Sequence, residues 1–140
     1  MTGKVLIDTN ILVYAYDYSD REKQNKSTNL LNKLVNQNVG AISTQILSEF
    51  FNIITREIVD PLSPVEAETR VVSFCRIWPV LAVNEMIILE AIRGVREHSF
   101  SFWDSQVWAT ARLNQIKLIY SEDFSHDSFI DGVQFINPLL

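Results

Sequence analysis

Four acidic residues lie beside strongly apolar segments of this chain. Asp8 follows the run "VLI", and Asp123 follows "LIY" after two polar residues. Glu49 lies within "ILSEFFNII", and Asp104 lies within "FSFWDSQVW". A carboxylate among large apolar side chains is energetically costly unless another group compensates its charge. Because the same arrangement occurs four times, we expect these acids to share one site.

Clustered carboxylates indicate a site for a divalent cation. Neighbouring carboxylates raise one another's pKa, and a bound cation reverses this effect. Mg²⁺ and Mn²⁺ favour oxygen ligands, whereas zinc normally needs His or Cys, and His98 and His126 have no spacing typical of a zinc site. A cluster that holds Mg²⁺ typically acts on phosphate, because the ion neutralises it, activates a water and stabilises the leaving oxygen. The four acids therefore predict metal-dependent phosphate chemistry.

Each acid also has a structural interpretation. Asp8 can cap the helix that follows it, and Asp104 can complete a variant capping box. Glu49 can lie on a solvent-exposed helix stripe, while Glu122 and Asp123 can be ordinary turn acids. Two of the four candidates end strands and the other two interrupt apolar helices, and this joint pattern favours a site over independent caps and turns.

Strand-like and helix-like segments alternate along the chain. The expected strands are residues 5–8, 39–43, 78–83, 116–121 and 132–137, the last at an edge. The expected helices are residues 9–17, 20–38, 44–58, 63–76, 84–98 and 101–115. Such alternation predicts a three-layer α/β/α fold, with a parallel sheet of four to five strands between helices. Ligands of such sheets bind outside the carboxyl ends of the strands, where Asp8 and Asp123 are expected.

The segment at 44–58 has two apolar stripes. At the 3.6-residue period, the wider stripe is predicted to face the core; it contains Leu47, Phe50, Phe51, Ile54 and Ile58. Ile46 and Ile53 form a second stripe together with Glu49. One small domain can hardly cover both, so the second stripe predicts a surface that binds another chain.

Bulk properties fit one domain over residues 1–140. The 12 basic and 17 acidic residues give a net charge of −5, which argues against a protein that coats duplex nucleic acid. The one cysteine, Cys75, is expected to be a small buried hydrophobe. Asp8 and Asn10 interrupt the first apolar stretch, and no run is long enough to span a membrane, so we expect a cytoplasmic protein.

The four acids, in order and in their sequence contexts, resemble the PIN domain, the nuclease fold of VapC-type bacterial toxins. The contexts are "LIDTNIL", "STQILSEF", "SFWDSQVWATA" and "LIYSEDF", and the tail "IDGVQFINPLL" is also similar to the bacterial branch. The resemblance covers nearly the whole chain. It implies that Asp8, Glu49, Asp104 and Asp123 bind Mg²⁺ or Mn²⁺.

The resemblance also implies roles for individual residues. Asp8 and Asp104 would be the most direct metal ligands. Glu49 would position the attacking water or a second metal, and Asp123 would complete the outer part of the site. Asn10 and Ser121 match polar residues that support the acids.

Family membership would further imply endonucleolytic cleavage of RNA, a homodimer, and an antitoxin encoded beside the toxin. Arg93 and Arg96, three residues apart on a helix, are candidate RNA phosphate contacts, although a solvated helix face explains them as well. Trp103 and Trp108 can stack on bases or belong to the core, and their four-residue spacing favours the core.

Three other classes compete with this interpretation. A phosphoryl-transfer hydrolase with a nucleophilic Asp8 commonly needs a second acid two residues on, where this chain has Asn10. A receiver-like domain needs a lysine at the end of a late strand, whereas Lys117 begins one. A non-catalytic PIN-like scaffold would bind RNA or a partner without cutting, and the intact set of four acids argues against it.

Overall fold

The centre of the computed structural model, which describes residues 1 and 3–140, is a six-stranded sheet of order β3-β2-β1-β4-β6-β5. The strands are β1 (Val5–Ile7), β2 (Gly40–Ser43), β3 (Val80–Leu81), β4 (Leu118–Tyr120), β5 (Ser128–Ile130) and β6 (Val133–Ile136). Neighbouring strands are parallel except for the antiparallel pair β5 and β6. The predicted α/β sheet is confirmed, with one more strand than expected.

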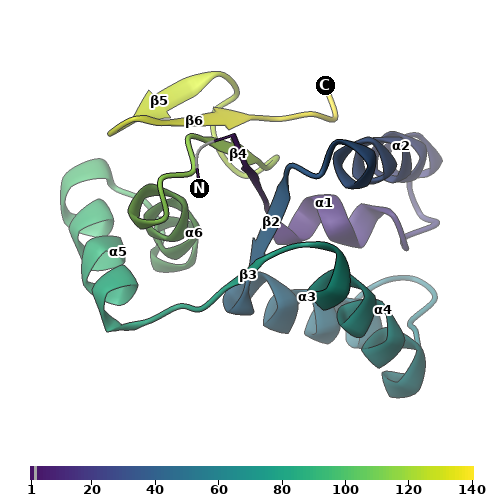
Figure 1. Cartoon of the computed structure of the whole chain (residues 1–140). Coiled ribbons are helices and arrows are strands. Elements are labelled where there is room, and N and C mark those ends of the chain that lie inside the picture. Colours follow the sequence, from purple (N-terminus) through teal and green to yellow (C-terminus); the bar gives the residue numbers. More distant parts are fainter. Residues whose placement is uncertain (2) are drawn as a thin grey trace.

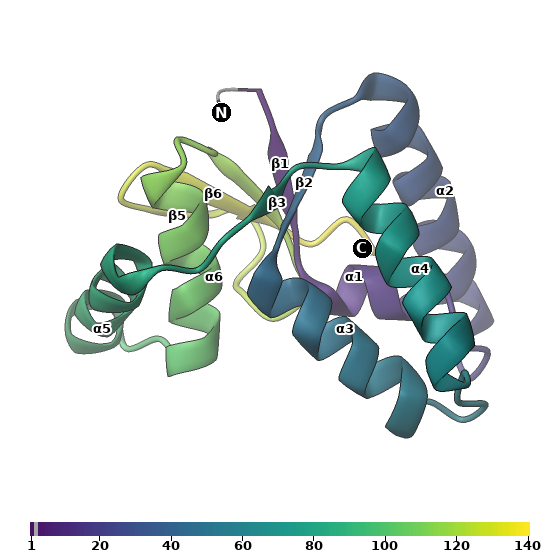
Figure 2. The same cartoon turned by 60° about the horizontal axis from the view of Figure 1, so that its bottom comes forward.

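Six helices within residues 1 and 3–140 cover the two faces of the sheet. They are α1 (Thr9–Tyr14), α2 (Arg21–Gln37), α3 (Thr44–Arg56), α4 (Pro64–Ile77), α5 (Glu85–His98) and α6 (Phe102–Leu113). Helices α5 and α6 lie on one face and the other four lie on the opposite face (Figures 1 and 2), which is the expected three-layer arrangement. Across the described residues, each helix is too short or too polar to cross a membrane.

The last strand is not at the edge of the sheet, so that prediction is wrong. Strand β6 pairs with β4 on one side and with β5 on the other. Asp131 and Gly132 connect β5 to β6, and both have positive φ, 47° and 83°. A two-residue turn of this kind suits an Asp-Gly pair and folds an antiparallel hairpin. This Asp-Gly signal is visible in the sequence and predicts the edge strand β5.

Polar caps set the starts of the helices that reach the carboxyl end of the sheet. Asp8 caps α1 by accepting from Thr9 N at 2.8 Å. Ser43 caps α3 by accepting from Ile46 N at 3.2 Å. Each cap satisfies a backbone donor that the helix itself leaves free. The caps therefore fix where the side chains of the first helical turns point.

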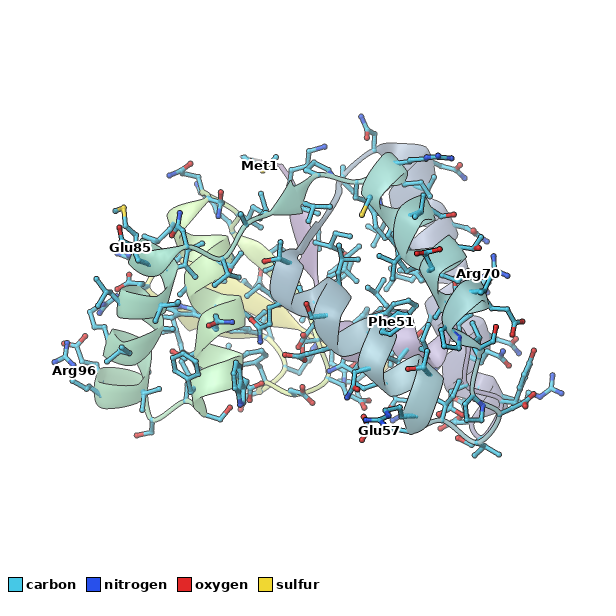
Figure 3. The ribbon with its side chains drawn as sticks, turned by 90° about the horizontal axis from the view of Figure 1, so that it is seen from below. Met1, Phe51, Glu57, Arg70, Glu85 and Arg96 are labelled. Atoms are coloured by element: carbon cyan, nitrogen blue, oxygen red, sulfur yellow. The ribbon has the colours of Figure 1, made fainter. Side chains whose placement is uncertain are left out.

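The orientation of α3 differs from the prediction. Phe50 and Ile54 are fully buried, as predicted, and so is Ile46 of the second stripe, whereas Leu47 is only partly buried and Phe51 is exposed. Phe51 lies between α3 and α4 (Figure 3). The predicted second stripe is therefore not a free binding surface, because the domain's own core covers Ile46. Burial follows the position of the sheet and α1 relative to α3, which periodicity alone cannot give.

Two other burial predictions are also wrong. Cys75 is exposed, since it lies on the outer side of α4 rather than against the core. Of the two tryptophans on α6, Trp108 is fully buried, as predicted, but Trp103 is exposed.

Close packing of α5 on α6 holds the helix that carries Asp104. A Cβ atom at Gly94 would collide with Ser105 Oγ and with the ring of Trp108, so glycine permits this approach. Ser105 Oγ donates to the Ala91 carbonyl at 2.6 Å. Trp108 Nε1 donates to the Ile130 carbonyl at 3.2 Å, which also ties α6 to the hairpin.

Candidate active site

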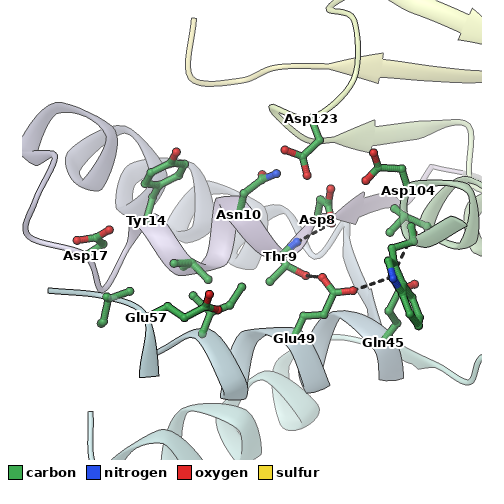
Figure 4. A pocket seen from close by; sticks show the side chains of 15 residues that line it. Asp8, Thr9, Asn10, Tyr14, Asp17, Gln45, Glu49, Glu57, Asp104 and Asp123 are labelled. Atoms are coloured by element: carbon green, nitrogen blue, oxygen red, sulfur yellow. Dashed lines mark hydrogen bonds between the residues drawn. The ribbon is translucent and has the colours of Figure 1, made fainter. Parts of the chain in front are cut away.

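The four predicted acids line one cavity at the carboxyl end of the sheet. Strands β1 and β4 are adjacent and parallel, with Ile7 opposite Tyr120, so the residues that follow them meet at the same edge. Helices α3 and α6 approach from opposite faces and add Glu49 and Asp104. The cavity has a volume of about 300 Å³, and Figure 4 shows the four carboxylates directed toward a common space.

Asp8 is the most buried of the four, with 4% of its surface exposed. Its carboxylate accepts from Thr9 N at 2.8 Å and from Ser121 Oγ at 2.7 Å. Burial nevertheless raises the pKa of Asp8 to about 7, and the negative charges of Asp123 and Glu49 act in the same direction. Two hydrogen bonds thus fail to compensate the charge, and a cation would supply what is missing.

Glu49 is held by donors on both of its oxygens. Gln45 Nε2 donates to Glu49 Oε1 at 2.8 Å, and Thr9 Oγ1 donates to Oε2 at 3.3 Å. Gln45 Nε2 also donates to the Trp103 carbonyl at 3.1 Å. Gln45 therefore joins α3 to the start of α6, and sequence reasoning missed it. Its position four residues before Glu49 on one helix was the available signal.

The sequence left two functions open for Asp104; its side chain faces the cavity, and only its backbone takes part in the helix cap. Its backbone N–H donates to Ser101 Oγ at 3.2 Å, so Ser101 caps α6. Its side chain faces the cavity (Figure 4). Burial raises the pKa of Asp104, and the charge of Glu49 raises it further. Helix capping fixes the backbone, which leaves the carboxylate free for the site.

Asp123 is the most exposed of the four acids and lies in the loop after β4. Partial burial raises its pKa, and the charge of Asp104 adds to that effect. Its backbone N–H donates to Ser121 Oγ at 3.0 Å. Because Ser121 also bonds Asp8, one hydroxyl orients two of the acids.

Asn10 and Ser121, the two predicted supporting residues, contact each other. Asn10 Nδ2 donates to Ser121 Oγ at 3.4 Å, and Asn10 Oδ1 accepts from Glu122 N at 3.4 Å. The two residues thus bind the start of α1 to the loop that carries Asp123.

Glu122 is not the simple turn acid that the sequence suggested. Its carboxylate accepts from Tyr14 Oη and from Lys23 Nζ, the latter at 2.9 Å. Lys23 Nζ also lies 4.8 Å from the centre of the Tyr14 ring, in a cation–π contact. These contacts anchor the loop after β4 to α1 and α2 beside the cavity.

The charge around the cavity is of one sign. Among residues 1 and 3–140, the lining side chains include no Lys, Arg or His. The lining includes six acids: Asp8, Asp17, Glu49, Glu57, Asp104 and Asp123. Such a site suits a cation, and neighbouring carboxylates without one raise one another's pKa.

A divalent ion fits the chemistry of these donors, which are all oxygens. No group of three or more His, Cys, Asp or Glu side chains in the described chain already has a spacing that could hold an ion. Mg²⁺ usually keeps several waters and takes only one or two carboxylates directly. The open carboxylate arrangement is compatible with that mode.

The two candidate arginines do not line this cavity. Arg93 is paired with Glu90, Glu97 and Asp131, with the shortest contact at 2.6 Å. Arg96 lies on α5. Figure 3 shows it well apart from Glu57, which is one of the residues that line the cavity. Their role as RNA contacts stays a prediction, and for Arg93 it would require breaking existing ion pairs.

The sequence of this chain also matches the model of a known protein family, and the fold and the acidic cavity are consistent with that family. The PIN domain family model matches residues 5–129. The chain therefore belongs to the PIN domain family, and the resemblance seen in the sequence is confirmed.

Solved structures of similar fold include bacterial toxins and their complexes. The sarcin–ricin loop-cleaving toxin VapC20 of Mycobacterium tuberculosis is 17% identical, with a TM-score of 0.68 over 91% of this chain and 98% of that one. A toxin–antitoxin complex from Klebsiella pneumoniae has 18% sequence identity and a TM-score of 0.69, and the match covers 96% of this chain and 98% of that one. The structure of FitAB bound to a DNA fragment has 16% sequence identity and a TM-score of 0.71, and the match covers 97% of this chain and 96% of that one. A comparison with curated proteins gives no match.

Proposed function

We propose that this protein is a Mg²⁺- or Mn²⁺-dependent endoribonuclease that cleaves RNA phosphodiester bonds at the quartet Asp8, Glu49, Asp104 and Asp123. One observation carries the proposal: the quartet lines a cavity with six acids and no basic side chain among its lining residues. The negative charge and the raised pKa of Asp8, Asp104 and Asp123 are unfavourable for stability, and a bound cation offsets both.

The position of each quartet member in the fold suits the role that we propose for it. Asp8 and Asp104, from a strand end and a helix start, are proposed as the most direct ligands. Asp123 completes the outer part of the site. When bound, the ion neutralises phosphate charge, lowers the pKa of a coordinated water and stabilises the leaving oxygen.

Glu49 is proposed to orient the attacking water and take its proton. Thr9 and Gln45 hold one oxygen each, so the carboxylate cannot rotate freely. A carboxylate oxygen has more than one lone pair, so Glu49 can accept a water proton while it keeps these bonds.

The alternative of a receiver-like domain disagrees with the sheet. Lys117 immediately precedes β4, and Asp8 immediately follows the parallel strand β1. The two side chains therefore lie at opposite ends of the sheet, so Lys117 cannot pair with Asp8. A hydrolase with a nucleophilic Asp8 commonly needs a second acid two residues on. Position 10 is an asparagine, which further disfavours that class.

RNA as substrate is supported by family membership and by the fold shared with a toxin that cleaves the sarcin–ricin loop. The test is incubation of the purified protein with single-stranded and stem–loop RNA, and with DNA of the same sequence, in Mg²⁺, in Mn²⁺ and in EDTA. We expect RNA cleavage in either metal and none in EDTA. RNA binding without cleavage in either metal would instead identify a non-catalytic scaffold.

We further propose that the protein is a homodimeric toxin held inactive by an antitoxin. Several chains of similar fold were solved as toxin–antitoxin complexes. An arginine from such a partner could pair bidentately with the cavity carboxylates in place of the metal. An apolar groove of about 650 Å³ between α3 and α4, with Leu47, Phe51, Val65 and Val71 in its lining, could take an amphipathic segment.

Growth provides the test of the toxin proposal. Expression of the wild type without a partner should arrest bacterial growth, and expression of Asp8→Asn at the same level should not. Co-expression of a cognate antitoxin should restore growth. Normal growth with the wild type alone would contradict the toxin role while leaving the nuclease proposal in place.

A further inference from the structure

A second cavity adjoins the acidic one on the side of α3 and α6. Its volume is about 310 Å³, within the range of pockets that hold small ligands. It shares Gln45, Glu49 and Trp103 with the acidic cavity. The side chains that belong to the second cavity alone include Thr44, Ser48 and Gln106. Hydroxyl and amide groups thus replace most of the carboxylates.

Trp103 forms a wall between the two cavities and is unusually exposed for a tryptophan, at 62%. Its backbone is nonetheless tied to α3, and its ring contacts one neighbour. Its backbone carbonyl accepts from Gln45 Nε2 at 3.1 Å, and its ring meets Phe102 edge-on with the ring centres 5.1 Å apart. A large, exposed aromatic side chain thus lies next to Asp104 in the chain and lines both cavities, where a ligand can reach it.

Gln45 lies at the boundary of the two cavities. Its Nε2 donates to both Glu49 Oε1 and the Trp103 carbonyl, which fixes the orientation of the amide. Its Oε1 is then left buried without a partner among the described residues, in a side chain that is only 9% exposed. Buried acceptors are nearly always paired, but this oxygen has less than 1 Å² of exposed surface, so Gln45 acts here by fixing the Trp103 backbone and not as a ligand contact.

We infer that the second cavity is a nucleobase subsite, in which a base next to the scissile phosphate stacks on Trp103 beside the hydroxyl and amide groups of the lining. This inference rests on the proposed function. A phosphate would be repelled, because the lining contains Glu49 and, among the described residues, no basic side chain. Nucleobases are neutral, have a stacking face, and carry amino or ring N–H donors at their edges.

The ligand for the test is a short single-stranded 2′-O-methyl RNA, which resists cleavage, in the presence of Mg²⁺. The protein has three tryptophans, and Trp78 and Trp108 are buried, so quenching of fluorescence reports on Trp103. We expect quenching that saturates with the oligonucleotide. A matched oligonucleotide of the same length without bases should quench far less, which separates stacking of a base from stacking of a sugar.

Variants measured by anisotropy of a labelled oligonucleotide quantify the subsite. Trp103→Ala should weaken binding by about five- to a hundredfold, the range for loss of one base–aromatic stack, and Trp103→Phe should weaken it less. Phe129→Ala is the matched control, because Phe129 is a similarly exposed aromatic, at 67%, on strand β5, and it lines neither cavity. It should bind like the wild type. The baseless oligonucleotide should bind equally to the wild type and to Trp103→Ala.

Two outcomes would overturn the subsite. One is unchanged binding by Trp103→Ala with no quenching in the wild type. The other is a changed oligomeric state of Trp103→Ala in light scattering, which would identify Trp103 as a contact between copies of the chain. The nuclease proposal fails separately: quenching without cleavage of unmodified RNA contradicts only the nuclease, and cleavage without quenching contradicts only the subsite.

Discussion

Ser121 Oγ donates a 2.7 Å hydrogen bond to Asp8 Oδ2, joining two residues that are 113 positions apart in the chain. The bond connects the ends of the adjacent strands β1 and β4. The same oxygen accepts from Asp123 N at 3.0 Å. One hydroxyl therefore joins the carboxylate of Asp8 to the backbone of the loop that carries Asp123, which brings these two acids to the same cavity.

The first prediction concerns the charge of Asp8. Asp8→Asn keeps nearly the same volume and removes one negative charge, so metal binding should weaken and RNA cleavage should fall by orders of magnitude. The folded state should persist, because the Asn oxygen can still accept from Thr9 N, and its NH₂ group can donate to Ser121 Oγ in place of the bond that Asp8 accepts. The measurements are cleavage rates in Mg²⁺ and circular dichroism. Wild-type cleavage by the purified variant would refute the assignment of Asp8.

The second prediction is a loss of stability with rising pH in metal-free buffer. The pKa of Asp8 rises from 3.8 to about 7 on folding, so between these values the folded protein keeps a proton that the unfolded chain has lost. The free energy of unfolding should therefore decrease across this window, by at most about 1.4 kcal/mol per pH unit from this group. The raised pKa values of Asp104 and Asp123 act in the same direction.

Urea unfolding in EDTA from pH 4.5 to 7.5 measures this slope. Asp8→Asn removes the group, so the variant should show a shallower slope and exceed the wild type in stability at pH 7.5. Equal slopes for the two proteins would mean that Asp8 titrates as it does in the unfolded chain.

The third prediction is stabilisation by the metal. Binding to the folded state alone should raise the free energy of unfolding by about 2.7 kcal/mol when free Mg²⁺ is a hundred times its Kd. The shift should grow with pH, because the ligands must be deprotonated. Melting curves with and without Mg²⁺ test this on the wild type and on Asp104→Asn. An equal shift in both proteins would show that the ion binds elsewhere.

The fourth prediction concerns Glu122, which anchors the loop of Ser121 and Asp123 to Lys23 and Tyr14. Glu122→Gln loses the ion pair with Lys23, a partly exposed contact that contributes about 0.2–1 kcal/mol to stability. We expect a small stability change but about a tenfold loss of Mn²⁺ affinity, as for other residues that orient metal ligands. Titration calorimetry measures the affinity.

The matched control for this variant is Glu22→Gln. Glu22 lies on α2, the helix of Lys23, and pairs with Lys26 at 3.1 Å through a side chain that is 78% exposed and, among the described residues, makes no ion pair with the loop after β4. It should bind Mn²⁺ like the wild type. Equal affinities for both variants would remove the positioning role from Glu122.

The fifth prediction concerns the groove between α3 and α4. Phe51→Asp places a charge in this groove and should weaken capture of the antitoxin, while cleavage of RNA by the free protein stays unchanged. Val59→Asp is the control, because Val59 is 75% exposed and lies outside the groove. Pull-down with the co-expressed partner compares the two. Full capture by Phe51→Asp would exclude the groove as the docking site.

Much of the fold followed from local signals in the sequence. Short apolar runs, helical periodicity and capping residues such as Ser63 with Glu66 act within one element, so they can be recognised without knowing the neighbours. The position of Asp8 at the end of a strand predicted its place at the carboxyl edge of the sheet, because parallel strands share that edge. The quartet could therefore be chosen from residue type and context.

What the sequence alone determined was which segments form strands and helices and which acids reach the sheet edge; tertiary structure decided which faces are covered and which side chains meet. The exposure of Phe51, Trp103 and Cys75 depends on how neighbouring helices pack, and helical period cannot distinguish two apolar faces of one helix. The contacts of Gln45 and Glu122 join residues far apart in the chain. Such pairs arise only when the sheet order brings their elements together, since hydrogen bonds require specific distances that no local pattern encodes.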